Sequence, residues 1–201
     1  QTFGPAAVAC MGSTRNSLET QAAIKRLCQI QGWQGPTFWI DQESETNVKT
    51  AVSERDPDLS VSLRDLEKAD YILAVGVDPV NEAPMLALSM RQARRNGGKV
   101  TLIDPRPVSL PLDFDHLPVS AQAVELCLAL LIKESVDPDM VKAAGRHIHE
   151  YFDTISDENR IFDSNRELIN TVAKDLCLSQ RPVIVCGTQI VSDRVPGMAA
   201  D

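Results

Sequence analysis

Five short apolar runs, each closed by glycine or aspartate, constrain the fold of this chain more than any other feature. Residues 6–12, 71–76 and 182–187 end in glycine, while residues 36–40 and 99–103 lead into aspartate. Continuous apolar runs of this length are typical of strands covered on both faces, as in a parallel sheet. We therefore expect these five segments to form the sheet core.

Helical patterns fill the intervals between these runs. Residues 17–31 have helical apolar spacing, with Ser17 as the expected N-cap and Gly32 as the stop. Residues 83–96 end in arginines, which suit the dipole of a helix C-terminus. Further helices are expected at 121–134, 138–145 and 164–178. The alternation predicts an α/β fold: an open, mainly parallel, Rossmann-like sheet of about five or more strands with helices on both faces.

The length of 201 residues fits one sizeable domain, and we expect residues 1–201 to form it. The polar stretch 41–62 is interpreted as a surface excursion, and residues 137–163 as a small helical excursion on the rim of the sheet. The chain starts without methionine or a secretory leader, so we expect a fragment of a larger multidomain protein.

Composition restricts the kinds of partner. With 20 basic and 28 acidic residues the net charge is −8, which argues against nucleic-acid binding because that depends on neutralising phosphates. Apolar runs fall short of the roughly 20 residues that cross a bilayer, so we expect no direct membrane insertion.

The cysteines do not form a metal-binding pattern. They are scattered, without a C-x-x-C pair or histidines at zinc spacing, and most lie in apolar runs as small buried hydrophobes would. Their odd number suits a reducing compartment. The pair His147 and His149 would diverge on a helix, so we expect no metal site there either. The five cysteines are Cys10, Cys28, Cys127, Cys177 and Cys186.

Candidate site residues lie where the expected strands end. Gly12, Gly76, Asp104 and Gly187 all follow strands, and in open α/β sheets ligands bind outside the carboxyl ends of the strands. These loops could form a mononucleotide site, or the glycines could simply end strands and start turns. The full G-x-G-x-x-G fingerprint is absent.

Two further loops carry polar candidates with alternative roles. Asp104 could bind a ribose hydroxyl or a purine edge, with Arg106 on a phosphate, or Asp104 could only cap the turn imposed by neighbouring prolines. The loop at 12–17, which includes Ser13, could seat an anion beside a helix start or serve only as a cap.

One segment resembles a known family. Residues 69–106 contain Ala69-Asp70, Gly76, Asp78-Pro79, Glu82-Ala83-Pro84 and Asp104-Pro105-Arg106. This order resembles the central α/β region of the molybdopterin oxidoreductase superfamily, which includes formate dehydrogenase α subunits and the large iron–sulfur subunit of NADH–quinone oxidoreductase. Residues 9–32 and 176–187 resemble the family's opening and closing segments.

The resemblance implies a role for the same loops. In cofactor-bearing relatives this region helps to bind a pyranopterin guanine dinucleotide, which nominates Gly76, Asp78, Asp104 and Arg106. Asp78 stands where many of those relatives have asparagine, and an ionised carboxylate would repel a diphosphate. Glu82 adds to that repulsion. This departure favours the branch of the NADH–quinone oxidoreductase (NADH dehydrogenase) subunit, in which the molybdenum site is generally vestigial.

The resulting prediction is a non-catalytic scaffold domain of an electron-transfer subunit, itself part of an oxidoreductase. We expect no catalytic or metal-binding residue and no bound cofactor in the fragment. Molybdopterin guanine dinucleotide could occur in the parent, whose iron–sulfur clusters would lie in a missing N-terminal part. Expected partners are other domains of the parent and other subunits of a redox complex, in the cytoplasm, within the peripheral arm of a membrane-associated assembly.

Two alternatives stay open at this stage. The first is a functional cofactor-binding domain of a molybdenum formate dehydrogenase-type enzyme, and the second is a free-standing nucleotide-binding domain. The residues weighed as cofactor-binding are Gly12, Ser13, Gly76, Asp78, Asp104, Arg106 and Gly187.

Overall fold

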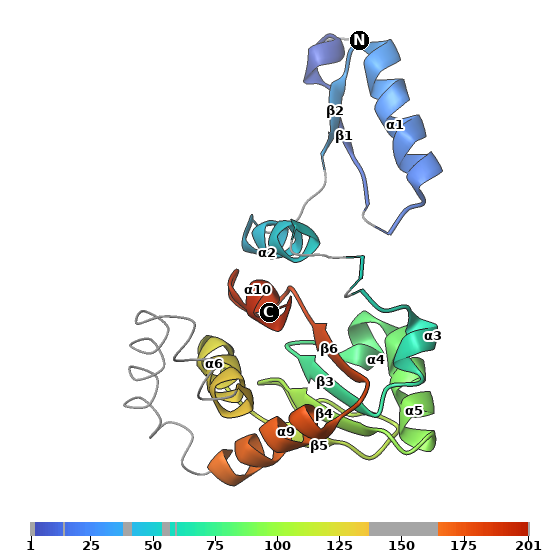
Figure 1. The fold of residues 1–201 in the computed structure, drawn as a ribbon. Helices are drawn as coiled ribbons and strands as arrows, with labels where there is room; N and C mark the ends of the chain where they lie inside the picture. The colour runs from blue at the N-terminus through green and yellow to red at the C-terminus, as the bar shows by residue number, and fades with distance from the viewer. Residues whose placement is uncertain are drawn as a thin grey trace. The chain divides into compact units, whose positions relative to one another are not determined.

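The computed structural model describes residues 3–13, 15–37, 42–53, 57–58, 60–136 and 165–200. It divides the chain into two compact units, residues 1–45 and 46–201, each described by itself below. Figure 1 shows the elements of both units. The expected helix at 138–145, the excursion at 137–163 and both of its histidines lie outside the described residues. A compact unit need not fold independently, so the single domain stays a prediction.

The smaller unit is a β-α-β arrangement. After a 3₁₀ turn, η1 (Pro5–Ala7), strand β1 (Ala9–Met11) leads to helix α1 (Leu18–Gln31) and to strand β2 (Gln34–Thr37), which pairs parallel with β1. The predicted caps of α1 are confirmed: the Ser17 side chain accepts a hydrogen bond from the Thr20 amide at 3.3 Å, and Gly32 ends the helix at φ 65°.

The larger unit contains a four-stranded sheet in the order β5-β4-β3-β6, and every pairing in it is parallel. Its strands are β3 (Tyr71–Val75), β4 (Lys99–Ile103), β5 (Asp115–Leu117) and β6 (Pro182–Cys186). The predicted α/β class and the parallel pairing are confirmed. The predicted sheet size is wrong, because the five apolar runs are divided between the two-stranded and the four-stranded sheet.

Strand β5 is not one of the five strands expected from the sequence. Asp113 and Asp115 are exposed, but Asp115 begins a strand whose Leu117 is fully buried. Three residues with a single buried side chain, bounded by prolines, give no alternating pattern. The strand forms because β4 offers it a parallel partner.

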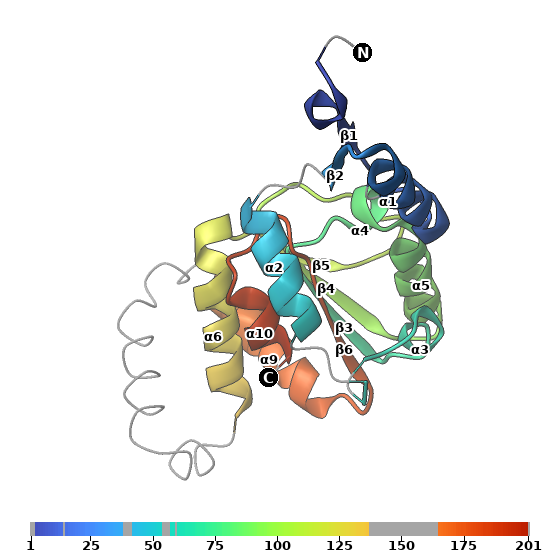
Figure 2. The same ribbon diagram turned by 90° about the horizontal axis from the view of Figure 1, so that it is seen from above.

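Helices cover both faces of the larger sheet. The short α3 (Leu63–Leu66) and α5 (Pro84–Arg95) lie on one face; α6 (Val124–Ser135), α9 (Arg166–Leu178) and α10 (Val195–Ala200) lie on the other. Figure 2 shows α5 and α6 on opposite sides of the strands. The 3₁₀ turn η2 (Ala121–Ala123) precedes α6.

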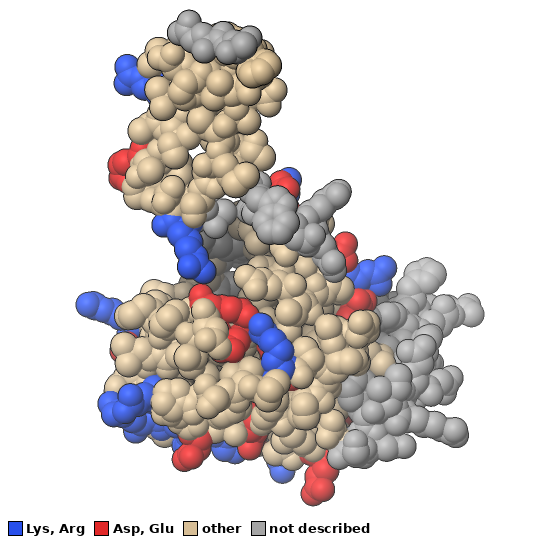
Figure 3. Space-filling model, turned by 180° about the vertical axis from the view of Figure 1, so that it is seen from behind, with Lys and Arg blue, Asp and Glu red and all other residues tan. Residues whose placement is uncertain are grey.

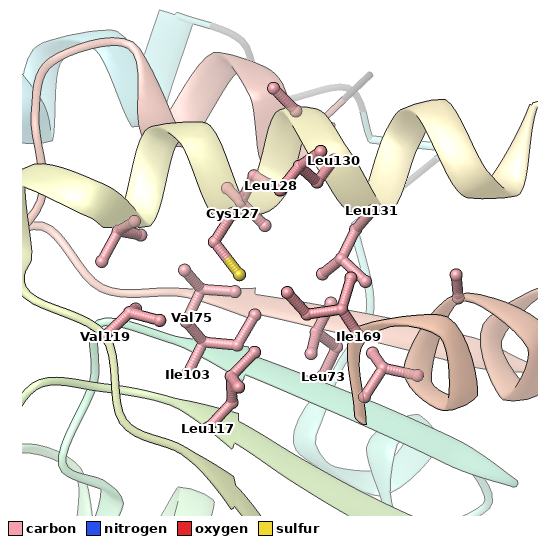
Figure 4. Packing of buried hydrophobic residues seen from close by; sticks show 14 of the residues in the cluster. Leu73, Val75, Ile103, Leu117, Val119, Cys127, Leu128, Leu130, Leu131 and Ile169 are labelled. Atoms are coloured by element: carbon pink, nitrogen blue, oxygen red, sulfur yellow. The ribbon is translucent and has the colours of Figure 1, made fainter. Parts of the chain in front are cut away.

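The central strand β3 explains why both faces are apolar. Leu73 and Val75 point into the cluster formed with α6 and α9 (Figure 4), whereas Ile72 and Ala74 pack with residues of α5 on the other face. All five residues of β3 are buried. A continuous apolar run is therefore required here, in place of an apolar–polar alternation.

The polar stretch 41–62, interpreted from the sequence as a surface excursion, contains a helix with a buried residue. Residues 42–53 form helix α2 (Gln42–Ser53), in which Asn47 is completely buried. The sequence did not reveal this helix because it reaches the core partly through an amide side chain and not through an apolar stripe. Among the described residues no helix is both long and apolar enough to cross a bilayer.

Candidate functional site

Three of the nominated residues meet at the carboxyl ends of neighbouring strands in the larger unit. The Gly76 amide, at the end of β3, donates to the Ile103 carbonyl of β4 at 2.8 Å. The Gly187 amide, at the end of β6, donates to the Val75 carbonyl at 2.8 Å. Asp104 follows Ile103 directly, so the structure brings these strand ends to one edge of the sheet.

The two glycines are required by the packing of the chain against itself. Gly76 has a φ of 61°, and a Cβ built on it would overlap the Val191 side chain. A Cβ on Gly187 would overlap the Gly76 backbone. Neither position needs a ligand to explain it, since only glycine allows this close backbone approach.

Asp104 and Arg106 form one compact ion pair. The Asp104 side chain is completely buried, and its Oδ1 accepts from the Arg106 amide at 2.8 Å and from Nε at 2.9 Å. Its Oδ2 accepts from Nη2 at 2.8 Å. The pairing is bidentate, the strong form of an arginine–carboxylate contact. It also closes the Asp-Pro-Arg turn, which is the capping role considered for Asp104.

Glu82 completes this cluster from α4 (Pro79–Glu82), the short helix after β3. Its Oε1 accepts from Arg106 Nη1 at 2.6 Å. The hydrogen bonds from the guanidinium to Asp104, above all, raise the pKa of Arg106, although burial opposes them, and Glu82 adds to the rise. Arg106 is thus held, fully charged, by two carboxylates.

Asp78 is the N-cap of α4. Its Oδ1 accepts from the amides of Val80 and Asn81, each at 3.2 Å, and its Oδ2 accepts from the Asn81 side chain at 2.7 Å. Burial acts to raise the pKa of Asp78, but these hydrogen bonds and the charge of Arg106 together lower it below its ordinary value. The carboxylate is therefore ionised at neutral pH.

Asn47 and His116 support the site and were not found as site residues from the sequence. The Asn47 Nδ2 donates to the carbonyls of Thr188 at 3.1 Å and Val191 at 2.7 Å, which holds the loop that packs on Gly76. The His116 Nε2 lies 3.0 Å from the Asp104 carbonyl oxygen. Asn47 sits in a polar stretch without a motif, so no local signal marked it.

Gly12 and Ser13 lie in the smaller unit, and the structure does not place them against the other candidates. The Gly12 amide donates to the Thr37 carbonyl at 3.0 Å, and the Ser13 hydroxyl accepts from the Arg15 amide at 3.3 Å. Both contacts are local to the smaller unit. In the described part of the chain, no cluster of three or more histidine, cysteine or acidic residues could hold a metal ion.

These features define an α/β protein with parallel strands and a charged loop cluster at their carboxyl ends. Residues 2–190 match the family described as molybdopterin oxidoreductase, and the chain belongs to that family. No curated protein matches. Among solved structures, acetylene hydratase from Pelobacter acetylenicus is similar over 96% of this chain at 12% identity, with a TM-score of 0.48. The chain spans 28% of that protein's length.

Proposed function

We propose that this chain is the central scaffold domain of a large electron-transfer protein resembling the iron–sulfur subunit of NADH–quinone oxidoreductase, with a loop site that no longer holds a pterin guanine dinucleotide. Membership of the molybdopterin oxidoreductase family supports the general class. The assignment to this branch and the loss of the cofactor rest on the side chains around the loop after β3.

One observation carries the proposal: the Asp78 carboxylate of the chain itself accepts the hydrogen bonds from the backbone amides at the start of α4. Amides at such a position are those that would receive a phosphate oxygen. A diphosphate would have to displace Asp78 and then lie against its negative charge, which is costly in a partly buried site.

The cation beside this loop is already paired with carboxylates of the chain. Arg106 directs Nε, Nη1 and Nη2 at Asp104 and Glu82, so its donor fork is committed within the cluster. With Asp78 on the neighbouring loop, these residues carry three carboxylates and one guanidinium. The residues at this edge of the sheet therefore do not fit a dinucleotide phosphate.

On this proposal the domain positions other parts of a multi-cluster protein and performs no chemistry itself. Iron–sulfur clusters would be held by a part of the parent outside this chain, and the partners would be its other domains and neighbouring redox subunits. The rival is a working cofactor-binding domain of the formate dehydrogenase type, which the family match supports equally.

The two hypotheses differ in the response they predict to GDP, which carries the guanosine and diphosphate of the dinucleotide. We expect the thermal unfolding temperature of the full chain to be unchanged by millimolar GDP. Asp78→Asn removes the charge but keeps a side-chain oxygen that can cap α4. Its unfolding temperature should likewise be unchanged by GDP. Arg106→Ala should lower the unfolding temperature, because it leaves buried Asp104 unpaired, yet give an equally flat GDP titration.

A saturable GDP effect would favour the rival. A ligand at 100 times its dissociation constant adds about 2.7 kcal/mol to stability, a shift that is easily measured. If wild type binds GDP and Asp78→Asn binds it more tightly, the loop faces the ligand and the scaffold proposal fails. Molybdenum at about one atom per chain in the purified parent would overturn it independently.

A further inference from the structure

Two cysteines of the smaller unit point into its interior. Cys10 is the middle residue of β1 and is half-buried, whereas Ala9 and Met11 on either side of it are exposed. Successive strand side chains point to opposite faces, so Cys10 alone of the three points inward. Cys28, on α1, is 1% exposed and is the buried residue of that helix.

The fold fixes both elements that carry these thiols against β2. β1 is fixed against β2 by the pairs Ala9–Gln34 and Met11–Thr37, and the Trp33 amide before β2 donates to the Cys28 carbonyl at 2.9 Å. Burial first, and then the Cys10 side chain, raise the pKa of Cys28, which is consistent with the two inward-pointing thiols being neighbours. All five cysteines are free thiols.

We propose that Cys10 and Cys28 form a reversible intramolecular disulfide, with a low-molecular-weight disulfide such as oxidised glutathione as the oxidant. The Cys10 thiolate attacks one sulfur of oxidised glutathione, which breaks that S–S bond and releases one glutathione thiolate. The Cys28 thiolate then attacks the Cys10 sulfur and releases the second glutathione. Two protein thiols lose two protons and two electrons, and one oxidised glutathione becomes two reduced molecules.

The order of attack follows from exposure. Cys10 is reached first because it is the more accessible thiol of the pair. Burial, followed by the contact with Cys10, raises the pKa of Cys28, so the second step is the slower one. It should speed up as the pH rises, because more Cys28 is then deprotonated.

The two other buried or half-buried cysteines are poor competitors. Burial raises the pKa of Cys127 to about 12 and that of Cys186 to about 11, which leaves almost no thiolate at neutral pH. Cys177 is exposed on α9, and its Sγ lies 3.4 Å from the Ser135 carbonyl oxygen. It is the matched control thiol.

The test incubates the full chain in glutathione buffers from reducing to oxidising, quenches with acid and labels the free thiols with a maleimide. Intact mass and peptide mapping then give the number and identity of the oxidised cysteines. We expect a cross-linked peptide pair containing Cys10 and Cys28, which accounts for two lost labels, whereas exposed Cys177 should gain at most a mixed disulfide with glutathione. Cys177→Ser should give the same cross-link, and reductant should reverse it.

Two variants keep the result decisive if one of them misfolds. Cys10→Ser and Cys28→Ser should each abolish the cross-link, and Cys28→Ser should leave a stable mixed disulfide with glutathione on Cys10, the thiol that is reached first. The proposal is overturned if all cysteines keep their labels at ratios that oxidise ordinary dithiols, or if the only linked peptides contain Cys177 or join two chains. Equal cross-linking in Cys10→Ser would overturn it as well.

Discussion

At the scale of the residue, the conformation of the loop after β3 is fixed by ion pairs and packing contacts within the chain. Arg106 is bound by Asp104 and Glu82, and Val191 fills the space beside Gly76. The family resemblance nominated Gly76, Asp104 and Arg106 as cofactor contacts. Here each has a partner within the chain, which is the physical basis of the scaffold proposal.

Gly76 allows the packing contribution to be separated from the backbone contribution. Gly76→Ala should destabilise the protein by about 3 kcal/mol, because alanine is strained at φ 61° and its Cβ meets Val191. Gly97→Ala is the matched control: Gly97 has φ 93° with open space around it, so only backbone strain of about 1–2 kcal/mol applies. Urea unfolding measures both values.

The double variant Gly76→Ala/Val191→Ala sharpens this comparison. Truncating Val191 removes the side chain that the new methyl group would meet, so part of the Gly76→Ala cost should be recovered beyond additivity. Strictly additive losses would mean that Val191 does not occupy the space beside Gly76.

At the scale of the element, Asp70 ties three strands together at their amino ends. Its carboxylate accepts from the Gln180 and Arg181 amides, at 2.8 and 2.9 Å, just before β6. Its carbonyl accepts from the Lys99 amide at 2.9 Å, where β4 begins. The Ala-Asp pair that contributed to the family resemblance thus has a structural role at the edge of the sheet opposite the candidate site.

Removing the Asp70 carboxylate should weaken the attachment of the start of β6 to the sheet. Asp70→Ala leaves two amides without their charged acceptor, and we expect a loss of about 2–3 kcal/mol at pH 7. Asp113→Ala is the control. The Asp113 side chain is 95% exposed, and its ion pair with Arg94 is long at 3.8 Å. Its removal should therefore change the unfolding free energy by no more than about 0.5 kcal/mol.

The same substitution has a defined pH dependence. Burial acts to raise the pKa of Asp70, but the hydrogen bonds from Gln180 and Arg181 outweigh it and lower the pKa below the ordinary value. A lowered folded-state pKa gives stability that is present above about pH 4 and lost as the pH falls further. The Asp70→Ala difference in unfolding free energy should therefore shrink between pH 7 and pH 3, and a constant difference would contradict this account.

At the scale of the whole molecule, the two units differ in how much core they contain. The larger unit buries clusters on both faces of β3, whereas the described residues of the smaller unit bury Cys28 alone. Met11, Leu18 and Ile30 are 68–81% exposed there. In Figure 3 few charged side chains mark the smaller unit, while acidic and basic ones are interspersed over the larger unit.

Amide hydrogen exchange should show this difference directly. Amides of Ile72–Val75 should open only with global unfolding, while those of α1 and β2 should exchange at least about 100-fold faster, because a two-stranded sheet with little core is marginally stable. Oxidation to the proposed Cys10–Cys28 disulfide should slow exchange in the smaller unit by roughly 10- to 100-fold. The β3 amides are the internal control and should not change. Uniform protection across both units in the reduced protein would contradict the expectation.

The sequence by itself determined the local structure of this protein. The apolar runs located β1, β3, β4 and β6 and part of β2, and Ser17, Gly32 and the terminal arginines of α5 marked helix ends, because these features depend on neighbours a few residues apart. Only the tertiary structure decided how the strands were shared between two sheets. It also decided that Asn47 would hold carbonyls up to 144 residues away, that Arg106 would pair with Glu82, and that Cys10 and Cys28 would both point into the smaller unit. Such contacts join distant segments, and no local pattern of charge or hydrophobicity specifies which distant partner a side chain will meet.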